Sequence, residues 1–156
     1  ILKVLNDKNI KTKRLNVYKF NKRNWQMLAS KNENNLSYKQ SLDYIVHEPN
    51  DKTIILGFDS SSRRYKENDI SWIWDIDFEI LNDKSIKNII LIGKFCYDLQ
   101  VRMEYAKIDK NKIILVEDLS KLSKTIKTKT KGNIYSMVCF DKEIELKKII
   151  KEEQND

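Results

Sequence analysis

The chain has 156 residues, of which 40% are hydrophobic and 34% charged, and its formal net charge is +7. This length predicts one domain, over residues 1–156, and the hydrophobic content excludes a disordered chain. No apolar run approaches the roughly 20 residues of a membrane span, so we expect no transmembrane segment. Because the sequence begins with Ile1 rather than methionine, we also expect it to be a piece of a longer protein.

The predicted elements alternate between strands and helices along the chain. Short apolar or alternating runs predict strands over residues 13–20, 25–30, 52–58, 88–92, 112–116 and 133–140. Helical spacing of apolar residues predicts helices over residues 35–46, 97–106, 119–127 and 143–152, the third of them lying on the surface. The apolar side of the second helix is predicted to consist of Leu99, Val101, Met103 and Tyr105. The polar stretch 60–69 is interpreted as a loop.

Four of the predicted strands are almost wholly apolar and alternate with helices, which is typical of a parallel sheet covered on both faces. We therefore predict an α/β fold, with a three-layer, open, mostly parallel sheet and helices on both of its faces. In such sheets functional residues follow the carboxyl ends of strands. Asp59, Asp118 and Asp141 stand within two residues of three of these ends.

Several kinds of chemistry lack their sequence patterns here. With three glycines in all, the chain has no phosphate loop and no dinucleotide-binding fingerprint. Cys96 and Cys139 are predicted to be reduced, buried packing residues, and the lone His47 is predicted to lie partly exposed at a helix end. No metal site is predicted, although closely spaced acids leave Mg²⁺ as a lesser alternative. By these tests the chain alone is not a complete enzyme.

The positive charge is spread along the chain, and only residues 121–131 form a dense lysine run. That run contains no aromatic residue on which a base could stack. We therefore expect no specific nucleic-acid binding, although a basic nucleic-acid-binding domain remains an alternative that salt dependence would test.

Residues 71–79, with the sequence SWIWDIDFE, concentrate aromatic and acidic side chains. They contain two of the three tryptophans of the chain, together with Asp75, Asp77 and Glu79. In a structural interpretation the tryptophans fill the core and Asp69 caps a short helix through Ser71. In a functional interpretation the aromatic side chains form a rigid wall that presents an acid at the surface.

Residues 69–79, together with Gly93–Ala106, resemble the C-terminal domain of the MurT subunit of lipid II isoglutaminyl synthase, a relative of the Mur ligases. The family pattern D-x-S-W-x-W-D-x-D-F-E is matched throughout residues 69–79. The family pattern G-x-R-x-x-D-x-x-x-R-x-x-Y-A is matched at Gly93, Asp98, Arg102, Tyr105 and Ala106. A third pattern, K-N-P-x-G-x-x-Q, is matched more weakly by Lys31, Asn32 and Gln40. The resemblance covers roughly residues 13–140.

The resemblance implies a Mur-ligase-like fold and a part in an amidation reaction. In the family, a GatD-type glutaminase subunit releases ammonia, and the MurT subunit uses ATP and Mg²⁺ to amidate the D-glutamate α-carboxylate of lipid II. ATP binding belongs mostly to an upstream domain, so no cofactor is expected for this domain alone, which is predicted to be inactive by itself. The implied location is the cytoplasm, at the inner face of the membrane.

The resemblance also implies roles for individual residues. An acid that completes the cysteine–histidine site of the glutaminase is assigned to Asp69, with Asp75 as the second candidate. The residues expected to contact nucleotide or substrate are Lys31, Asn32, Asp98 and Arg102. The residues expected to face the partner subunit are Trp72, Trp74 and Asp77.

Four family positions differ in this chain. Phe95 replaces the arginine of the second pattern, and Glu33 replaces the proline of the third, whose glycine is also missing. The glycine that usually precedes the tryptophan pattern is absent from residues 66–68. These differences leave an alternative function open, in which the same fold is a divergent, non-catalytic protein-interaction module.

Overall fold

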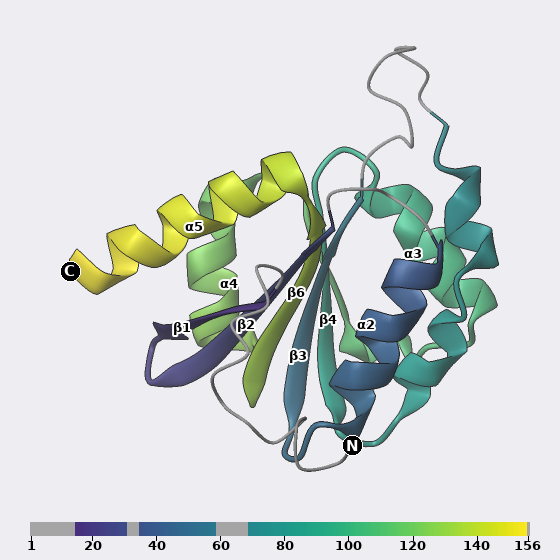
Figure 1. Ribbon diagram of the computed structural model, residues 1–156, viewed down its shortest axis with the longest axis horizontal. Helices are drawn as coiled ribbons and strands as arrows, with labels where there is room; N and C mark the ends of the chain where they lie inside the picture. Colours follow the sequence, from purple (N-terminus) through teal and green to yellow (C-terminus); the bar gives the residue numbers. More distant parts are fainter. Residues whose placement is uncertain (1–14, 31–34, 59–68, 156) are drawn as a thin grey trace, which may run out of the picture.

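A six-stranded sheet forms the centre of the computed structural model, which describes residues 15–30, 35–58 and 69–155 (Figure 1). Its strands are β1 (Leu15–Phe20), β2 (Arg23–Ser30), β3 (Lys52–Gly57), β4 (Ile86–Ile92), β5 (Ile113–Val116) and β6 (Asn133–Cys139). Their order across the sheet is β1-β2-β6-β3-β4-β5. Only the pairing of β1 with β2 is antiparallel among the described strands, and the other neighbours run parallel. The predicted mostly parallel sheet is confirmed.

Helices cover both faces of this sheet, which gives the three predicted layers (Figure 1). One face carries α2 (Asn35–His47), the 3₁₀ helices η1 (Ser71–Asp75) and η2 (Phe78–Asn82), and α3 (Cys96–Tyr105). The other face carries α4 (Leu122–Lys129) and α5 (Phe140–Asn155). Two further 3₁₀ helices, η3 (Lys110–Lys112) and η4 (Leu119–Lys121), flank β5. Among the described residues, no helix is long and apolar enough to cross a membrane.

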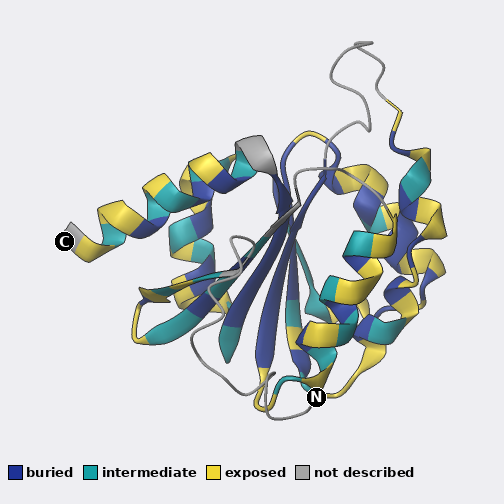
Figure 2. Ribbon diagram, in the orientation of Figure 1, coloured by how far each residue is buried: buried dark blue, intermediate teal, exposed yellow. Residues whose placement is uncertain are grey.

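Apolar side chains of the central strands divide between the two faces with the period of two that a strand imposes. On β3, Ile54 and Leu56 pack under α2 and α3, whereas Ile55 packs under α4 and α5. Figure 2 shows the central strands almost wholly buried, with exposed positions on the outer sides of the helices. This burial on both faces is the reason that these strands are continuous apolar runs in the sequence.

Two predicted helical faces are corrected by the structure. In α3, Leu99 and Met103 are buried as predicted, but Val101 and Tyr105 are exposed. An α-helix repeats every 3.6 residues, so positions four apart share a side, and Val101 and Tyr105 therefore point away from the sheet. The helix predicted to lie on the surface over residues 119–127 comprises η4 and α4, and it buries Leu122 and Ile126.

Two glycines shape the carboxyl edge of the sheet. At Gly57, a Cβ atom would lie 2.7 Å from Cγ1 of Ile92, so only glycine allows this close approach at the end of β3. Gly93 has a φ of +81°, and this left-handed residue turns the chain from β4 toward α3. Gly57 therefore allows the close packing of β3 with β4, and Gly93 allows the turn that leads into α3.

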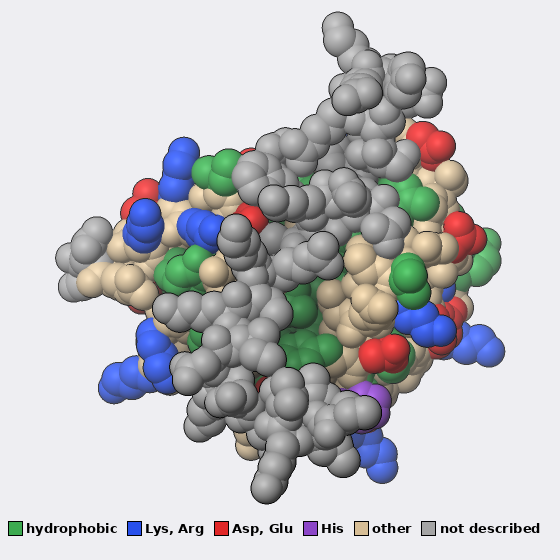
Figure 3. All heavy atoms as spheres, viewed as in Figure 1, with side chains coloured by type: hydrophobic (Ala, Val, Ile, Leu, Met, Phe, Trp, Pro, Cys, Tyr) green, Lys and Arg blue, Asp and Glu red, His purple; other side chains and the backbone are tan. Residues whose placement is uncertain are grey.

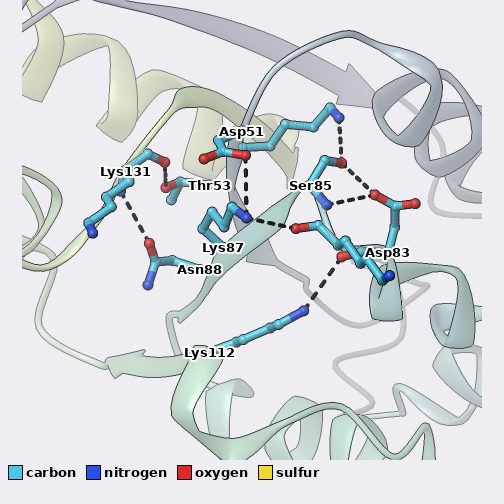
Figure 4. Close-up of polar contacts among 10 residues, drawn as sticks. Asp51, Thr53, Asp83, Ser85, Lys87, Asn88, Lys112 and Lys131 are labelled. Atoms are coloured by element: carbon cyan, nitrogen blue, oxygen red, sulfur yellow. Dashed lines mark hydrogen bonds and ion pairs between the residues drawn. The ribbon is translucent and has the colours of Figure 1, made fainter.

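Polar side chains join the amino ends of β3 and β4. Lys52 is 1% exposed, and its Nζ donates to Oγ of Ser85 at 2.7 Å and to the carbonyl of Val46 at 3.5 Å. Ser85 in turn donates its backbone N–H and its hydroxyl to Oδ1 of Asp83 (Figure 4). These hydrogen bonds from Ser85 hold the pKa of Asp83 below its usual range. A buried ammonium is thereby connected to an ionised carboxylate through one hydroxyl.

Replacing Ser85 by alanine is expected to lower the free energy of unfolding by about 1–3 kcal/mol, because the buried Lys52 ammonium would lose its closer acceptor. Urea unfolding followed by tryptophan fluorescence measures this change. Asp51→Asn is the matched control, since it removes only the ion pair with Lys87 at 3.4 Å, whose two side chains are 41% and 55% exposed. The control should cost less than about 1 kcal/mol. Equal effects of the two substitutions would contradict the prediction.

Candidate functional site

The Asp69 side chain is exposed just before η1, and it is hydrogen-bonded by Ser71, two residues later in the chain. Its Oδ1 accepts a hydrogen bond from the backbone N–H of Ser71 at 2.8 Å. That bond, followed by one from the Ser71 side chain, lowers the pKa of the Asp69 carboxyl below its ordinary value. The predicted contact between Asp69 and Ser71 is therefore present, but the N-cap residue of η1 is Ile70 and no side chain caps this helix. The carboxyl is ionised at neutral pH and free to accept further hydrogen bonds.

The two tryptophans of η1 have different surroundings. Trp72 is half-buried, and its ring centroid lies 5.2 Å from that of Tyr38 and 5.4 Å from that of Phe58. Trp74 is 49% exposed and contacts Tyr105 of α3 edge-on, with ring centroids 5.1 Å apart. The structural interpretation therefore holds for Trp72, which packs on the core, but not for Trp74, which stands at the surface. The functional interpretation stays a prediction.

Arg102 of α3 is 5% exposed and binds the segment that joins η1 to η2. Its two terminal nitrogens donate to the two carboxylate oxygens of Glu79 at 3.1 and 3.0 Å, and Nη2 also donates to the carbonyl of Ile76 at 2.7 Å. Such a two-pronged contact restricts the geometry as well as adding energy. The guanidinium carbon lies 5.7 Å from the Trp74 ring centroid and 5.4 Å from that of Phe78.

These contacts make the Arg102–Glu79 pair the link between α3 and the tryptophan segment. The hydrogen bonds from Arg102 are the main cause that lowers the pKa of the Glu79 carboxyl, so the pair is ionic at neutral pH. The guanidinium also lies against the ring of Trp74, one residue before the exposed Asp75. The pair therefore fixes the position of the exposed aromatic and acidic side chains beside it.

The guanidinium of Arg102 is occupied by partners within the protein. Its terminal nitrogens are engaged by Glu79 and by Ile76, and the side chain is buried. Asp98 lies exposed on the first turn of α3. The hydrogen bonds of Arg102 support a positioning role for it, and the nucleotide or substrate contacts predicted for Asp98 and Arg102 stay predictions.

Of the remaining predicted site residues, the structure describes Asp75 and Asp77. Asp75 and Asp77 are both exposed, at the end of η1 and just before η2. Lys31 and Asn32 lie outside the described residues. The structure therefore brings Trp74 together with Arg102, and it leaves the exposed acids around them.

A separate groove of about 550 Å³ lies beside the edge strand β5, between α3 and α4. Its polar lining combines both charges, with Glu117 and Asp118 near Lys121, and it includes Tyr97. None of the acids of the tryptophan segment lines it. This groove is not the site that the sequence motif indicates.

The cysteines and the histidine behave as predicted. Cys96 and Cys139 are free and buried, and burial raises the pKa of the Cys96 thiol, which disfavours a nucleophilic thiolate. His47 is exposed in the last turn of α2, with Nδ1 2.7 Å from the carbonyl oxygen of Asp43. Within the described ranges, no three His, Cys, Asp or Glu side chains are grouped so that they could hold a metal ion.

Sequence reasoning did not identify the partner of Arg102. The only sequence signal was that Glu79 and Arg102 both match the family patterns. No local spacing rule predicts a contact between residues 23 positions apart. The aromatic neighbours of Trp72, Tyr38 from α2 and Phe58 after β3, were missed for the same reason.

A comparison with protein-family models supports the family resemblance that the motif indicates. A search of curated proteins found no match to this chain. The family model for the MurT ligase C-terminal domain matches residues 31–141. The match includes the tryptophan segment, the whole of α3 and four of the six strands described above. Because the matched region exceeds half of the 156 residues, the chain belongs to the MurT ligase C-terminal family.

Proposed function

We propose that this domain works in a glutamine-dependent ligase that amidates the D-glutamate α-carboxylate of the peptidoglycan precursor lipid II. Membership of the MurT C-terminal family supports a MurT-related role in peptidoglycan synthesis. The finer assignment rests on Asp69, an exposed, ionised carboxylate held by Ser71 at the edge of a segment that Arg102 positions. The expected partner is a GatD-type glutaminase subunit.

In this proposal Asp69 completes the catalytic site of the glutaminase from outside. A glutaminase cysteine needs a histidine to take up its proton, and a carboxylate that accepts a hydrogen bond from that histidine fixes its orientation and stabilises its charged form. Asp69 suits this role because the hydrogen bond that its carboxylate accepts from the Ser71 backbone N–H favours the ionised form and leaves further lone pairs as acceptors. Asp75, exposed at the other end of η1, is the second candidate.

In this proposal an upstream domain of the full-length protein binds ATP and Mg²⁺. That upstream part also binds the lipid substrate. The described residues build no glycine-rich phosphate cradle, because Gly57 and Gly132 are in close contact with other chain segments and Gly93 forms a turn. Nucleotide or substrate contacts by Lys31, Asn32, Asp98 and Arg102 remain part of the proposal. The reaction would take place in the cytoplasm, at the inner face of the membrane.

One observation favours a second candidate, a divergent protein-interaction module without catalytic function. Phe95 occupies the position of a family arginine, and its ring is largely buried at the start of α3 with Nζ of Lys94 at 5.0 Å from the ring centroid. A hydrophobic side chain there cannot bind phosphate or carboxylate as an arginine would.

An amidation assay separates the two candidates. The full-length protein is incubated with its glutaminase subunit, lipid II, ATP and Mg²⁺, and either glutamine or ammonium is supplied as the nitrogen source. Formation of amidated lipid II from both sources supports the proposed ligase. A stable complex that yields no amidated product from either source would favour the interaction module.

A further inference from the structure

The side of α4 that faces away from the sheet carries lysines. Lys124 is exposed and lies midway between Leu122 and Ile126, which are buried against the sheet. Because a residue two positions from a buried one lies on the opposite side of an α-helix, Lys124 points outward. Lys121 and Lys127, three residues before and after Lys124, are also exposed and flank it.

The helix α5 extends this surface. It lies beside α4, since Glu153 pairs with Lys127 and accepts a hydrogen bond from the Ser123 hydroxyl at 3.4 Å. Lys148 is exposed midway between two buried residues of α5, and Lys151, about one turn further, is exposed as well. Within the described residues, no acid forms an ion pair with Lys124, Lys148 or Lys151. We call the following five residues the basic face: Lys121, Lys124, Lys127, Lys148 and Lys151.

Hydrogen bonds from three strands hold the carboxyl end of α4 in place. Arg23 of β2 donates from Nη1 to the carbonyl of Ile126 at 3.2 Å and to Oγ1 of Thr130 at 2.9 Å. Thr53 of β3 donates its hydroxyl to the carbonyl of Lys131 at 2.7 Å, and Asn88 of β4 accepts from the backbone N–H of the same lysine (Figure 4). Carbonyls at the end of a helix need such partners. The backbone that carries the lysines of α4 is therefore fixed before any ligand binds.

Charge is distributed unequally between the two faces of the sheet. Residues 119–140, which include α4, contain five lysines and no acid. Residues 69–83, which include η1 and η2 on the opposite face, contain five acids and no lysine or arginine. Figure 3 shows lysine and arginine side chains on the left-hand side, where Figure 1 places α4 and α5, and acidic side chains mainly along the right-hand edge. A negatively charged surface would therefore attract the domain with its basic face foremost.

We propose that the basic face binds the anionic lipid headgroups of a membrane surface. This inference rests on the proposed function in one respect, because an enzyme that acts on lipid II meets its substrate at a membrane. Lysines near an anionic bilayer are attracted to it, and their contributions accumulate. Ile144, which is 47% exposed and lies one turn before Lys148, would enter the headgroup region. Asp69, next to η1 on the opposite face, would remain in the aqueous phase.

The composition of the basic face argues against nucleic acid as its ligand. Residues 121–131 and 141–155 contain no aromatic residue and no arginine. Single-stranded nucleic acids are bound largely by stacking of bases on aromatic side chains, and arginine makes the commonest specific contact to guanine. Lysine ammonium groups act as compact point charges, which suit a surface of many interchangeable headgroups. A second copy of the chain would bring lysines against lysines, which is unfavourable.

Flotation of the full-length protein with lipid vesicles tests the proposal. Wild type is expected to bind vesicles made of equal parts of phosphatidylglycerol and phosphatidylcholine, but not vesicles of phosphatidylcholine alone. A triple variant with Lys124→Gln, Lys148→Gln and Lys151→Gln should bind the anionic vesicles about 100-fold more weakly, because each lysine near such a surface contributes about fivefold to binding. Added salt should release the wild-type protein, because salt screens exposed charges.

A second triple variant, with Lys39→Gln, Lys84→Gln and Lys107→Gln, is the matched control. It removes the same net charge at exposed positions on α2, between η2 and β4, and after α3, and it should bind nearly like wild type. Equal losses in the two variants would show that only net charge matters and would overturn the proposal. If the first variant lost affinity for a DNA duplex of random sequence while its vesicle binding stayed unchanged, the basic face would bind nucleic acid and the proposal would be wrong.

Amidation of lipid II dispersed in detergent separates this inference from the proposed function. The variant of Lys124, Lys148 and Lys151 should amidate detergent-dispersed lipid II like wild type, and should amidate lipid II in anionic vesicles more slowly. Amidation in detergent by a wild-type protein that does not bind anionic vesicles would overturn this inference and leave the proposed function standing. Vesicle binding that depends on the three lysines, without amidation in either medium, would support the membrane-binding face and contradict the proposed function.

Discussion

Replacing Asp69 by asparagine is expected to abolish glutamine-dependent amidation without dissociating the two subunits. Asparagine keeps the size of the side chain but offers no charge to stabilise a histidinium, and its amide can hold the histidine in the wrong tautomer. The corresponding change in serine proteases lowers kcat by about 10⁴-fold, so we expect a loss of about 10³–10⁴-fold in glutaminase activity. Glutamate release from glutamine by the assembled complex measures this activity directly.

Two comparisons show whether the loss belongs to the glutaminase step. Amidation supported by ammonium should continue in Asp69→Asn, because that nitrogen source bypasses the glutaminase. Asp75→Asn is the matched control, since Asp75 is an exposed acid at the other end of η1. Full glutaminase activity in Asp69→Asn, with a loss in Asp75→Asn, would transfer the role to Asp75. Full activity in both variants would remove it from this segment.

The second large effect concerns the Arg102–Glu79 pair, whose two side chains differ in exposure to solvent. The Arg102 side chain is 6% exposed and that of Glu79 is 51% exposed. Glu79→Ala leaves a buried cation with the carbonyl of Ile76 and is expected to cost about 3 kcal/mol. Arg102→Met fills most of the same volume with an uncharged side chain and leaves a carboxylate that water can reach, so it should cost less, about 1–2 kcal/mol. Urea unfolding at pH 7 compares the two.

The pH dependence of the same pair provides an independent check. The pKa of Glu79 is lowered in the folded state, chiefly by the hydrogen bonds from Arg102. Its contribution to stability is therefore complete above the ordinary glutamate pKa of about 4.3 and is lost as the pH falls through the lower, folded value. The difference in unfolding free energy between wild type and Glu79→Gln should shrink as the pH falls from 7 into that range. A difference that stays constant, or a larger cost for Arg102→Met than for Glu79→Ala, would contradict this account.

The Arg102–Glu79 pair also bears on the proposed function. Arg102 lies against Trp74 of η1 and binds the backbone between η1 and η2. Asp69 and Trp74 lie five residues apart, at the two ends of the same short segment. A partner that contacts Asp69 would thus meet a segment that Arg102 helps to hold in place.

Much of the fold followed from short-range patterns in the sequence. The apolar runs of β3, β4, β5 and β6 predicted a buried parallel sheet, because only a strand covered on both faces can be apolar throughout. The buried thiols, the exposed His47 and the bond from Ser71 to Asp69 followed from similarly local reasoning. The tryptophan–acid pattern indicated the family, since its rare residues recur at fixed spacing.

The sequence by itself therefore determined the class of fold and the family, but it did not determine the arrangement of the site. Only the tertiary structure separated Trp72 from Trp74, exposed Val101 and Tyr105, and paired Arg102 with Glu79. The reason is physical: periodicity records whether a residue lies on the inner or outer side of its own helix or strand. The partner of a buried guanidinium depends on how two segments 23 residues apart pack against each other, and that depends on the whole core.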